Sequence, residues 1–248
     1  MKKNGKKLIY FAVALIFIVA VAVISVVYMN KAPYVEMMKN TEEYKVEKVV
    51  KGDRIYFLNT GSADAILIES EGKFALVDAA EDSDNPRGFE DLAFPGTEQY
   101  VVDAIKKIAG DKKGKATLEF VLGTHSHSDH IGGMDTVILD KDITVKTAYL
   151  KKYDESKIET YEIERWDNTE VYEQMVSACK ERNVKLVQDM NEDKFTFGNF
   201  TMQFCNVYDP ENSELVGEND NAVGLLIEKD GMRAFLAADI DNKSGDED

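Results

Sequence analysis

The sequence predicts a layered α/β or α+β domain with mixed sheets, preceded by one membrane-spanning helix. Short apolar runs separated by turn residues are typical of buried strands, and several of them come in hairpin pairs. Two longer segments, residues 98–109 and 169–182, carry apolar residues at helical spacing. Strands that alternate with helices and hairpins in this way favour layers of helix and sheet around a shared core.

The N-terminal residues predict a membrane anchor. Residues 1–7 form a basic tail with four lysines, and residues 8–29 form an apolar run without a charged side chain. A run of this length spans a bilayer as one helix, which needs about 20 apolar residues. Because the lysines stay in the cytoplasm, we expect a single-pass protein of the cell membrane, with residues 30–53 as a tether and residues 54–248 as an extracellular domain. The alternative is a signal peptide cleaved near Ala20-Val21-Ala22 and a secreted product.

The composition narrows the classes of partner. The 248 residues carry a formal net charge of -16, which argues against broad nucleic-acid binding because phosphate neutralisation needs clustered Lys and Arg. Phosphate chemistry at a metal site stays open, since the ion is then the main local positive charge. Cys179 and Cys205 are too few for a disulfide framework, and they are either small buried apolar residues or one disulfide.

In chain order, the first half of the domain predicts a meander of buried strands and then a helix. Turn residues at Gly61-Ser62 and Glu71-Gly72 punctuate short apolar runs, which is the pattern of consecutive strands. A polar loop at residues 81–97 precedes the helix at 98–109. The predicted strands of this half are residues 55–58, 65–68, 74–77 and 118–122.

The second half predicts further alternation that ends in two hairpins. Glycine-containing turns at Gly198-Asn199 and Lys229-Asp230-Gly231 mark the hairpins. The last strand, residues 232–238, ends directly before Asp239. The other predicted elements are a helix opened by Gly132-Gly133, a strand at 144–150, the helix at 169–182 and a strand at 184–187.

All three histidines of the chain fall within one stretch of ten residues, Thr124 to Gly133. His125 and His127 are two residues apart on the turn that leaves a strand, so both rings can converge on one ion. Asp129 and His130 follow on a tightening turn and can face a second ion. Neutral imidazole and carboxylate bind Zn²⁺, with Mn or Fe as the alternatives, and two ions about 3.5–4 Å apart can clamp a phosphoryl or carbonyl group. The stretch predicts the metal-binding loop of a hydrolase.

One loop cannot complete a two-metal site, so further ligands must come from elsewhere. Asp239 follows an apolar strand, where a buried charge needs a partner or a metal. A helix-capping aspartate is the alternative there. Asp78 also ends an apolar strand, where it either orients a ligand histidine from outside the coordination sphere or is a plain turn residue.

The motif, Thr-His-Ser-His-Ser-Asp-His-Ile-Gly-Gly, resembles the HxHxDH signature of the metallo-β-lactamase superfamily. Three further segments occur in the order seen in its branch related to the competence protein ComEC: Asp64–Ile68, Ala75–Asp78 and Ala238-Asp239. Within that branch, residues 54–248 look most like the catalytic module of the choline-binding phosphorylcholine esterases. This similarity is carried by Ser62–Ser70, Tyr149–Tyr153, Trp166–Asn168 and Asp239–Asn242.

The resemblance implies an αββα sandwich with two divalent metal ions at its edge. His125 and His127 would bind one ion, Asp129 and His130 the other, and Asp239 would bridge them. A metal-bound hydroxide, oriented by Asp129, would attack a phosphodiester. Family substrates include phosphocholine esters of the cell wall, which suits an enzyme tethered to the outer face of the membrane.

The chain departs from the family pattern in two places. The superfamily has a C-terminal histidine after the Asp239 position, so we expect this chain to be a C-terminally incomplete domain. Its middle histidine ligand is also absent, and that place falls near Asn219-Asp220-Asn221, where Asp220 either substitutes as a ligand or lies on a solvated turn. Trp166, the single tryptophan, either holds a quaternary ammonium by cation–π attraction or is a core or rim residue.

Three functions stay open at this point. The first is a membrane-anchored, metal-dependent phosphodiesterase that acts on phosphocholine esters or on another phosphoester. The second is a nuclease-like role in DNA processing, as the relationship to ComEC suggests. The third is a degenerate, non-catalytic domain that kept the loop and lost the site.

Overall fold

The computed structural model describes residues 52–82, 96–207 and 217–241. The predicted basic tail, the anchor at 8–29 and nearly all of the tether lie outside these residues. No helix in the described part of the chain has the length and apolar character to cross a membrane.

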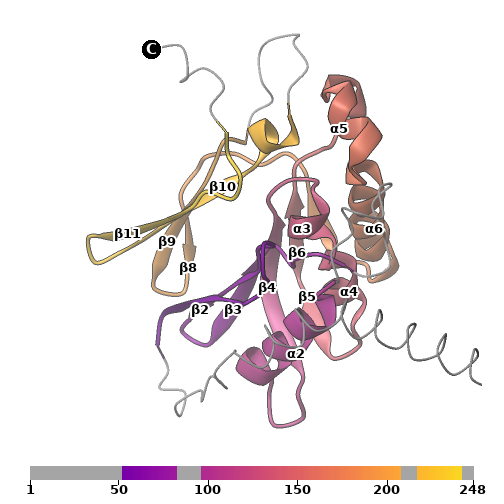
Figure 1. Ribbon diagram of the computed structural model, residues 1–248. Helices are drawn as coiled ribbons and strands as arrows, with labels where there is room; N and C mark the ends of the chain where they lie inside the picture. The colour runs from indigo at the N-terminus through magenta and orange to yellow at the C-terminus, as the bar shows by residue number, and fades with distance from the viewer. Residues whose placement is uncertain (1–51, 83–95, 208–216, 242–248) are drawn as a thin grey trace, which may run out of the picture. The chain divides into compact units, whose positions relative to one another are not determined.

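A seven-stranded sheet forms the centre of the domain (Figure 1). Its path is β1-β2-β3-β4-β6-β7, and β5 pairs beside β4. The first three strands are antiparallel, as the predicted meander requires, and β3 to β7 are parallel. The strands are β1 Arg54–Phe57, β2 Ile66–Ser70, β3 Lys73–Val77, β4 Ala116–Gly123, β5 Ile143–Val145, β6 Thr147–Leu150 and β7 Lys185–Val187.

The predicted single strand at 144–150 is wrong. The chain turns at Lys146, whose backbone N–H donates to the carbonyl of Leu118 at 3.0 Å. As a result, β5 pairs with the beginning of β4 and β6 pairs with its end. The motif loop then leaves β4 beside the end of β6.

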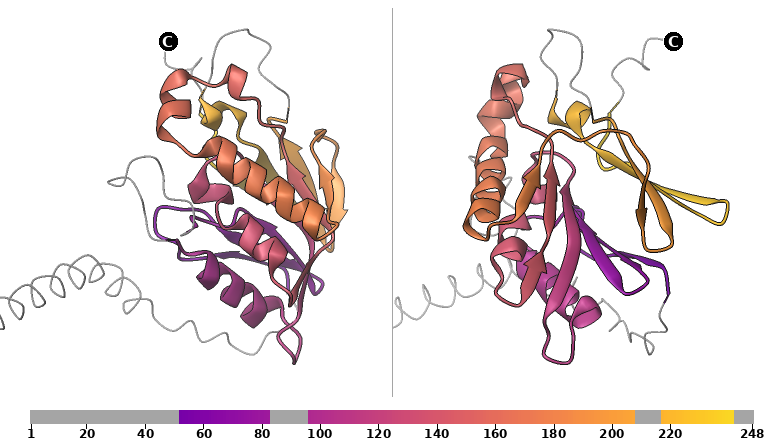
Figure 2. Two further views of the ribbon diagram at one scale, coloured as in Figure 1. Left: turned by 90° about the vertical axis from the view of Figure 1, so that its right-hand side faces the viewer. Right: turned by 180° about the vertical axis from the view of Figure 1, so that it is seen from behind.

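Helices cover one face of this sheet (Figure 2). The predicted helices at 98–109 and 169–182 are confirmed, the second with a shift of one residue. Val101, Val102 and Ile105 are the buried side of α2, as its spacing predicted. The helices are α2 Glu98–Ala109, α3 Ser128–Ile131, α4 Met134–Leu139, α5 Thr160–Arg165 and α6 Asn168–Glu181, with 3-10 turns η2 Glu155–Lys157 and η3 Glu218–Asn221.

A second, four-stranded antiparallel sheet packs on the opposite face. Both predicted hairpins are present in it, and its order is β11-β10-β9-β8. Its strands are β8 Phe195–Phe197, β9 Phe200–Cys205, β10 Gly224–Lys229 and β11 Met232–Leu236. The described residues therefore build three layers, helix, sheet and sheet, of the expected αββα order. A helix on the far side of the second sheet is not among them, and Phe235 on β11 is half exposed.

A polar network fastens the two sheets at one edge. Asp53 accepts the Ser70 hydroxyl at 2.5 Å and the Asn199 side-chain amide at 3.2 Å, and it pairs with Lys229. These partners, Lys229 first and Ser70 next, lower the pKa of Asp53 to about 2. The network joins the start of the large sheet to both hairpins of the small one.

Both cysteines are free, so the alternative of a single disulfide is wrong. Cys179 lies in α6 within the core between helices and sheet, and burial raises the pKa of its thiol to about 11. Cys205 ends β9 in the other sheet. The large sheet separates the two thiols.

Candidate metal centre

The motif loop begins where β4 ends and lies across the ends of β2 and β3. The backbone N–H of Ala79 donates to the His130 carbonyl at 2.7 Å, and that of Asp64 donates to the Asp129 carbonyl at 3.0 Å. Gly133 permits the close approach, because a Cβ there would lie 2.4 Å from the carbonyl oxygen of Ala79. The loop is thus held by backbone contacts that the glycine makes possible.

Asp78 anchors the loop from beneath. Its carboxylate accepts the backbone N–H and the hydroxyl of Thr124, both at 2.8 Å, and Nδ1–H of His130 at 2.8 Å. Asp78 is 1% exposed and has a left-handed φ of 55°, a conformation that costs energy for a residue with a side chain. Of the two roles that the sequence left open for Asp78, the structure shows the carboxylate that orients a histidine.

Thr124 transmits this orientation to His125. Its hydroxyl donates its single hydrogen to Asp78, so toward His125 Nδ1, 3.0 Å away, it can only accept. His125 therefore carries its proton on Nδ1. Nε2 of this ring is left as a bare lone pair, the form that a metal binds.

Glu162 orients His127 in the same way from the other side. Its Oε2 lies 3.4 Å from His127 Nε2 and also accepts the backbone N–H of Glu218 at 3.0 Å. With the Nε2 proton turned to Glu162, the bare nitrogen of His127 is Nδ1. This nitrogen lies 3.0 Å from His125 Nε2, close to the separation of about 3.3 Å that two nitrogens 2.0–2.1 Å from one tetrahedral ion require.

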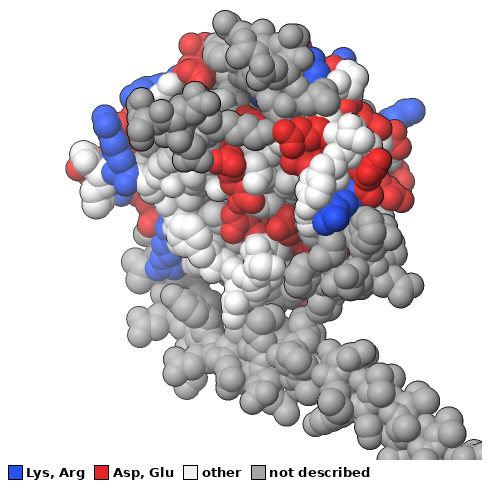
Figure 3. Space-filling view, turned by 45° about the horizontal axis from the view of Figure 1, so that its top comes forward, with Lys and Arg blue, Asp and Glu red and all other residues white. Residues whose placement is uncertain are grey.

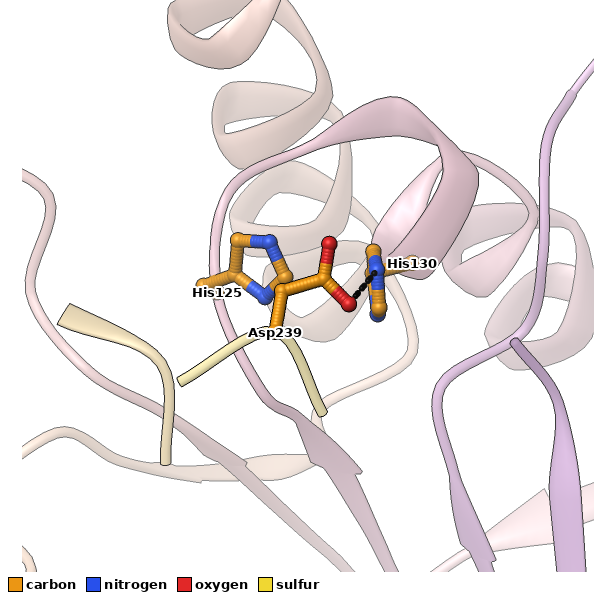
Figure 4. A group of neighbouring side chains, drawn as sticks. All are labelled: His125, His130 and Asp239. Atoms are coloured by element: carbon orange, nitrogen blue, oxygen red, sulfur yellow. Dashed lines mark ion pairs between the residues drawn. The ribbon is translucent and has the colours of Figure 1, made fainter. Parts of the chain in front are cut away.

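His125, His130 and Asp239 form a group that could hold a metal ion. One ligand atom of each residue lies within 4.8 Å of the others. Figure 4 shows the Asp239 carboxylate between the two imidazole rings, with Oδ1 3.4 Å from Nε2 of His130. Asp239 follows Ala238, which has a left-handed φ of 50° and turns the chain after β11 ends at Leu236.

Asp129 and Asp64 complete the acidic surroundings. Asp129, in α3, lines a cavity of about 270 Å³ together with His127 and Asp239, but it is in neither of the two close groups of possible ligands. The second such group is Asp64, Asp78 and His130. Because Asp78 is already occupied by three donors, we regard this second group as support for His130.

The charges of the site favour metal binding by His125. Burial lowers the pKa of His125 well below its usual value, and the neighbouring histidines lower it further. Burial also acts to lower the pKa of His130, but the carboxylates of Asp78 and Asp239 outweigh it and raise that pKa to about 11. The His130 hydrogen bond lowers the pKa of Asp239. A divalent ion that displaced the His130 proton would meet the same two carboxylates.

The motif loop has two further carboxylate supports, which the sequence did not reveal. Glu162 lies in α5, whose residues have no apolar periodicity and are not buried. Glu218 is 3% exposed, and its Oε1 accepts the backbone N–H of Ser126, between the two first histidines, at 2.9 Å. The sequence pointed to this part of the chain only through the run Asn219–Asn221, which directly follows Glu218. Trp166 also lines the cavity, with its ring centroid 6.3 Å from that of His127.

Buried imidazoles at the end of a strand, with carboxylates behind and between them, define a metal-binding α/β protein. Residues 58–169, which include the whole motif loop, match the family model of the metallo-beta-lactamase superfamily. Within residues 58–169 the chain thus has the sequence pattern of a metallo-beta-lactamase superfamily domain. No curated protein matches the chain.

Several solved structures are similar to this chain at low identity, and three of them are given as examples. CmlA, a diiron beta-hydroxylase from Streptomyces venezuelae, is 14% identical with a TM-score of 0.41, over 81% of this chain and 32% of that one. A Cronobacter sakazakii metallo-beta-lactamase with a HARLDQ motif is 10% identical with a TM-score of 0.42, over 73% and 60%. The metallo-beta-lactamase fold protein YhfI from Bacillus subtilis is 16% identical with a TM-score of 0.40, over 75% and 59%.

This chain therefore spans between a third and three fifths of the length of these structures. At such identities and TM-scores the likenesses carry no information on the chemistry of this chain.

Proposed function

We propose that this chain is a metal-dependent hydrolase that cleaves phosphodiesters. The observation that carries the proposal is the state of the three histidines. Each has one ring nitrogen engaged, by Thr124, Glu162 or Asp78, so that the other nitrogen can bind an ion, in the case of His130 after loss of its proton. A polar surface loop would not build three separate supports of this kind.

The residues then divide the work. Two divalent ions, Zn or alternatively Mn or Fe, would polarise the phosphoryl group of the substrate and lower the pKa of a bound water. His125 and His127 would hold one ion, Asp129 and His130 would hold the other, and Asp239 would be shared by both. We assign Asp129 to orient the attacking water from the wall of the cavity.

The cavity wall supports a substrate with a cationic group. Four of its lining residues carry carboxylates, Asp129, Glu162, Asp167 and Asp239, and no Lys or Arg among the described residues lines it. Trp166 adds an aromatic face of the kind that binds quaternary ammonium. Phosphocholine esters combine a phosphodiester with such a group, so we propose them as the substrate class.

Charge at the surface argues against the nuclease-like alternative. On the end of the molecule that carries α5 and η3, acidic side chains gather across the middle of the face, and Lys and Arg lie mainly toward its margins (Figure 3). A nucleic-acid strand needs a basic track beside the catalytic centre. The proposal keeps the apolar residues 8–29 as an anchor that holds the domain at the outer face of a membrane.

The experiment is a metal analysis and an assay of the purified full chain with p-nitrophenyl phosphorylcholine and bis-p-nitrophenyl phosphate. We expect about two ions per chain and turnover of both esters, with loss of metal and turnover in His127→Ala. Trp166→Leu should slow the choline ester and leave the bis-ester unchanged.

Other outcomes would refute parts of the proposal. Cleavage of the bis-ester alone would remove the choline assignment. Cleavage of single-stranded DNA in preference to both esters would favour the nuclease-like function. A folded chain that binds no metal and cleaves nothing would be the degenerate domain.

A further inference from the structure

The side-chain oxygen of Asn219 lies at the wall of the cavity without an ordinary hydrogen-bond partner among the described residues. Oδ1 of Asn219 is shielded from solvent, and no donor among the described residues meets it with the geometry of an ordinary hydrogen bond. Asn219 lines the cavity together with His127 and Asp239, and its side chain lies within interacting reach of the His125 ring. A buried carbonyl oxygen without a partner is unfavourable, so this atom points to a group that the protein binds.

The fold holds Asn219 firmly in this place. Before it, Glu218 is fastened to the motif loop through the Ser126 N–H at 2.9 Å. After it, the Val223 N–H donates to the Thr124 carbonyl, also at 2.9 Å. The 3-10 turn η3 is therefore attached to the histidine loop on both sides of Asn219. A side chain held this closely is oriented before any ion arrives.

The neighbouring residues of η3 have other roles. Asp220, which the sequence offered as a substitute ligand, accepts the backbone N–H of Gly217 through Oδ2 at 3.2 Å and closes the turn. Asn221 donates its side-chain amide to Oε2 of Glu218 at 3.1 Å. Of the three polar residues in the run, Asn219 is the one that lines the cavity.

We propose that Oδ1 of Asn219 is a ligand of the ion held by His125 and His127. The proposal rests on the metal-dependent function above and names a ligand of that same site. With Asn219, this ion has two imidazole nitrogens, one neutral amide oxygen and the shared Asp239 carboxylate as protein ligands. Oxygen is a harder donor than imidazole, so this set moves the preference of the site from Zn²⁺ toward Mn²⁺ and Fe²⁺.

Metal titration of the purified full chain tests the proposal without relying on turnover. Zn²⁺ and Co²⁺ are titrated against a competing chelator, and the visible bands of bound Co²⁺ report its ligand set. In Asn219→Ala we expect one of the two ions to bind at least about 100-fold more weakly, since loss of a partner outside the coordination sphere alone costs 10–100-fold. Asn219→His should restore both ions and favour Zn²⁺ at this site, with altered Co²⁺ bands. Asn221→Ala is the matched control in the same turn and should keep both ions.

The outcomes separate the ligand from a structural role and from the proposed function. Equal loss in Asn219→Ala and Asn221→Ala, without rescue by Asn219→His, would mean that Asn219 only shapes η3. Two ions bound by Asn219→Ala with unchanged affinity and unchanged Co²⁺ bands would also overturn the proposal while leaving the hydrolase standing. A wild-type chain that binds no ion would refute the hydrolase and this ligand together.

Discussion

Thr124 offers the sharpest test of how the metal centre is built. Its hydroxyl joins Asp78 to His125, and it is 1% exposed, so no water can take its place. Thr124→Val replaces this hydroxyl with a methyl group of nearly the same shape. The substitution therefore removes the hydrogen bonds and leaves the packing of the loop almost unchanged.

The size of the effect follows from the two bonds. The His125 Nδ1–H becomes a buried donor without an acceptor, which costs about 1–3 kcal/mol of stability. The ring also loses the partner that fixes its tautomer, and loss of such a partner weakens metal binding about 10–100-fold, or about 1.4–2.7 kcal/mol. Asp78 keeps the backbone N–H of Thr124 and the His130 ring as donors. The half of the site around His130 should therefore change less.

Two measurements check this prediction. Guanidinium unfolding of the metal-free protein gives the stability change, and a chelator competition gives the affinity for each ion. Thr124→Ser is the matched control, because it keeps the hydroxyl and loses only the methyl group. If Thr124→Val and Thr124→Ser bind both ions alike, the assignment of the bare nitrogen on His125 is wrong.

Three further predictions concern two supports of the loop and the network that fastens the two sheets. Glu162→Ala should weaken binding of the ion at His127 about 10–100-fold, and Glu162→Gln, which keeps an acceptor, should weaken it less; a chelator competition that shows equal losses would contradict the pairing. Gly133→Ala should destabilise the fold by about 2 kcal/mol or more in a denaturant titration, because its Cβ would meet the carbonyl of Ala79 at 2.4 Å, and unchanged stability would show that the loop can shift. Asp53 has a folded-state pKa of about 2 against 3.8, so it contributes stability above pH ~4 that is lost toward pH 2; Asp53→Asn should remove about 1 kcal/mol at pH 6 and flatten this part of the acid-unfolding profile.

The sequence predicted the elements whose patterns are local. The helix at 98–109 and both hairpins follow from apolar spacing and glycine turns, and these are the segments that bury one face against a sheet. Residues 144–150 predict one strand because all of them are compatible with strand structure. Its division at Lys146 depends on pairing with β4, which is distant in the chain.

The residues of the candidate site likewise fall into those that a local sequence pattern identifies and those that depend on contacts distant in the chain. Histidines are rare enough in this chain that their clustering alone marked the motif loop. Glu162 and Glu218 are two among 46 acidic residues, so composition could not single them out. What distinguishes them is burial and a hydrogen bond to the loop from segments 35 and 92 residues away in the chain. Such contacts are properties of the folded chain, which is why one support, Asp78 at the end of its strand, was foreseen and the others were not.

The two halves of the metal centre are therefore supported by elements that differ in how deeply they are buried. His130 is held by Asp78, at the end of a core strand, beneath helices that pack on the large sheet. His127 is held by Glu162 from α5, which has no buried residue of its own. Segments with few buried contacts open at lower free energy than core strands do. The half of the site that contains His127 should accordingly be the one that ligands order, and the cavity with Trp166 lies on that side. A substrate that fills the cavity would hold α5 in its place against the loop, where Glu162 already contacts His127.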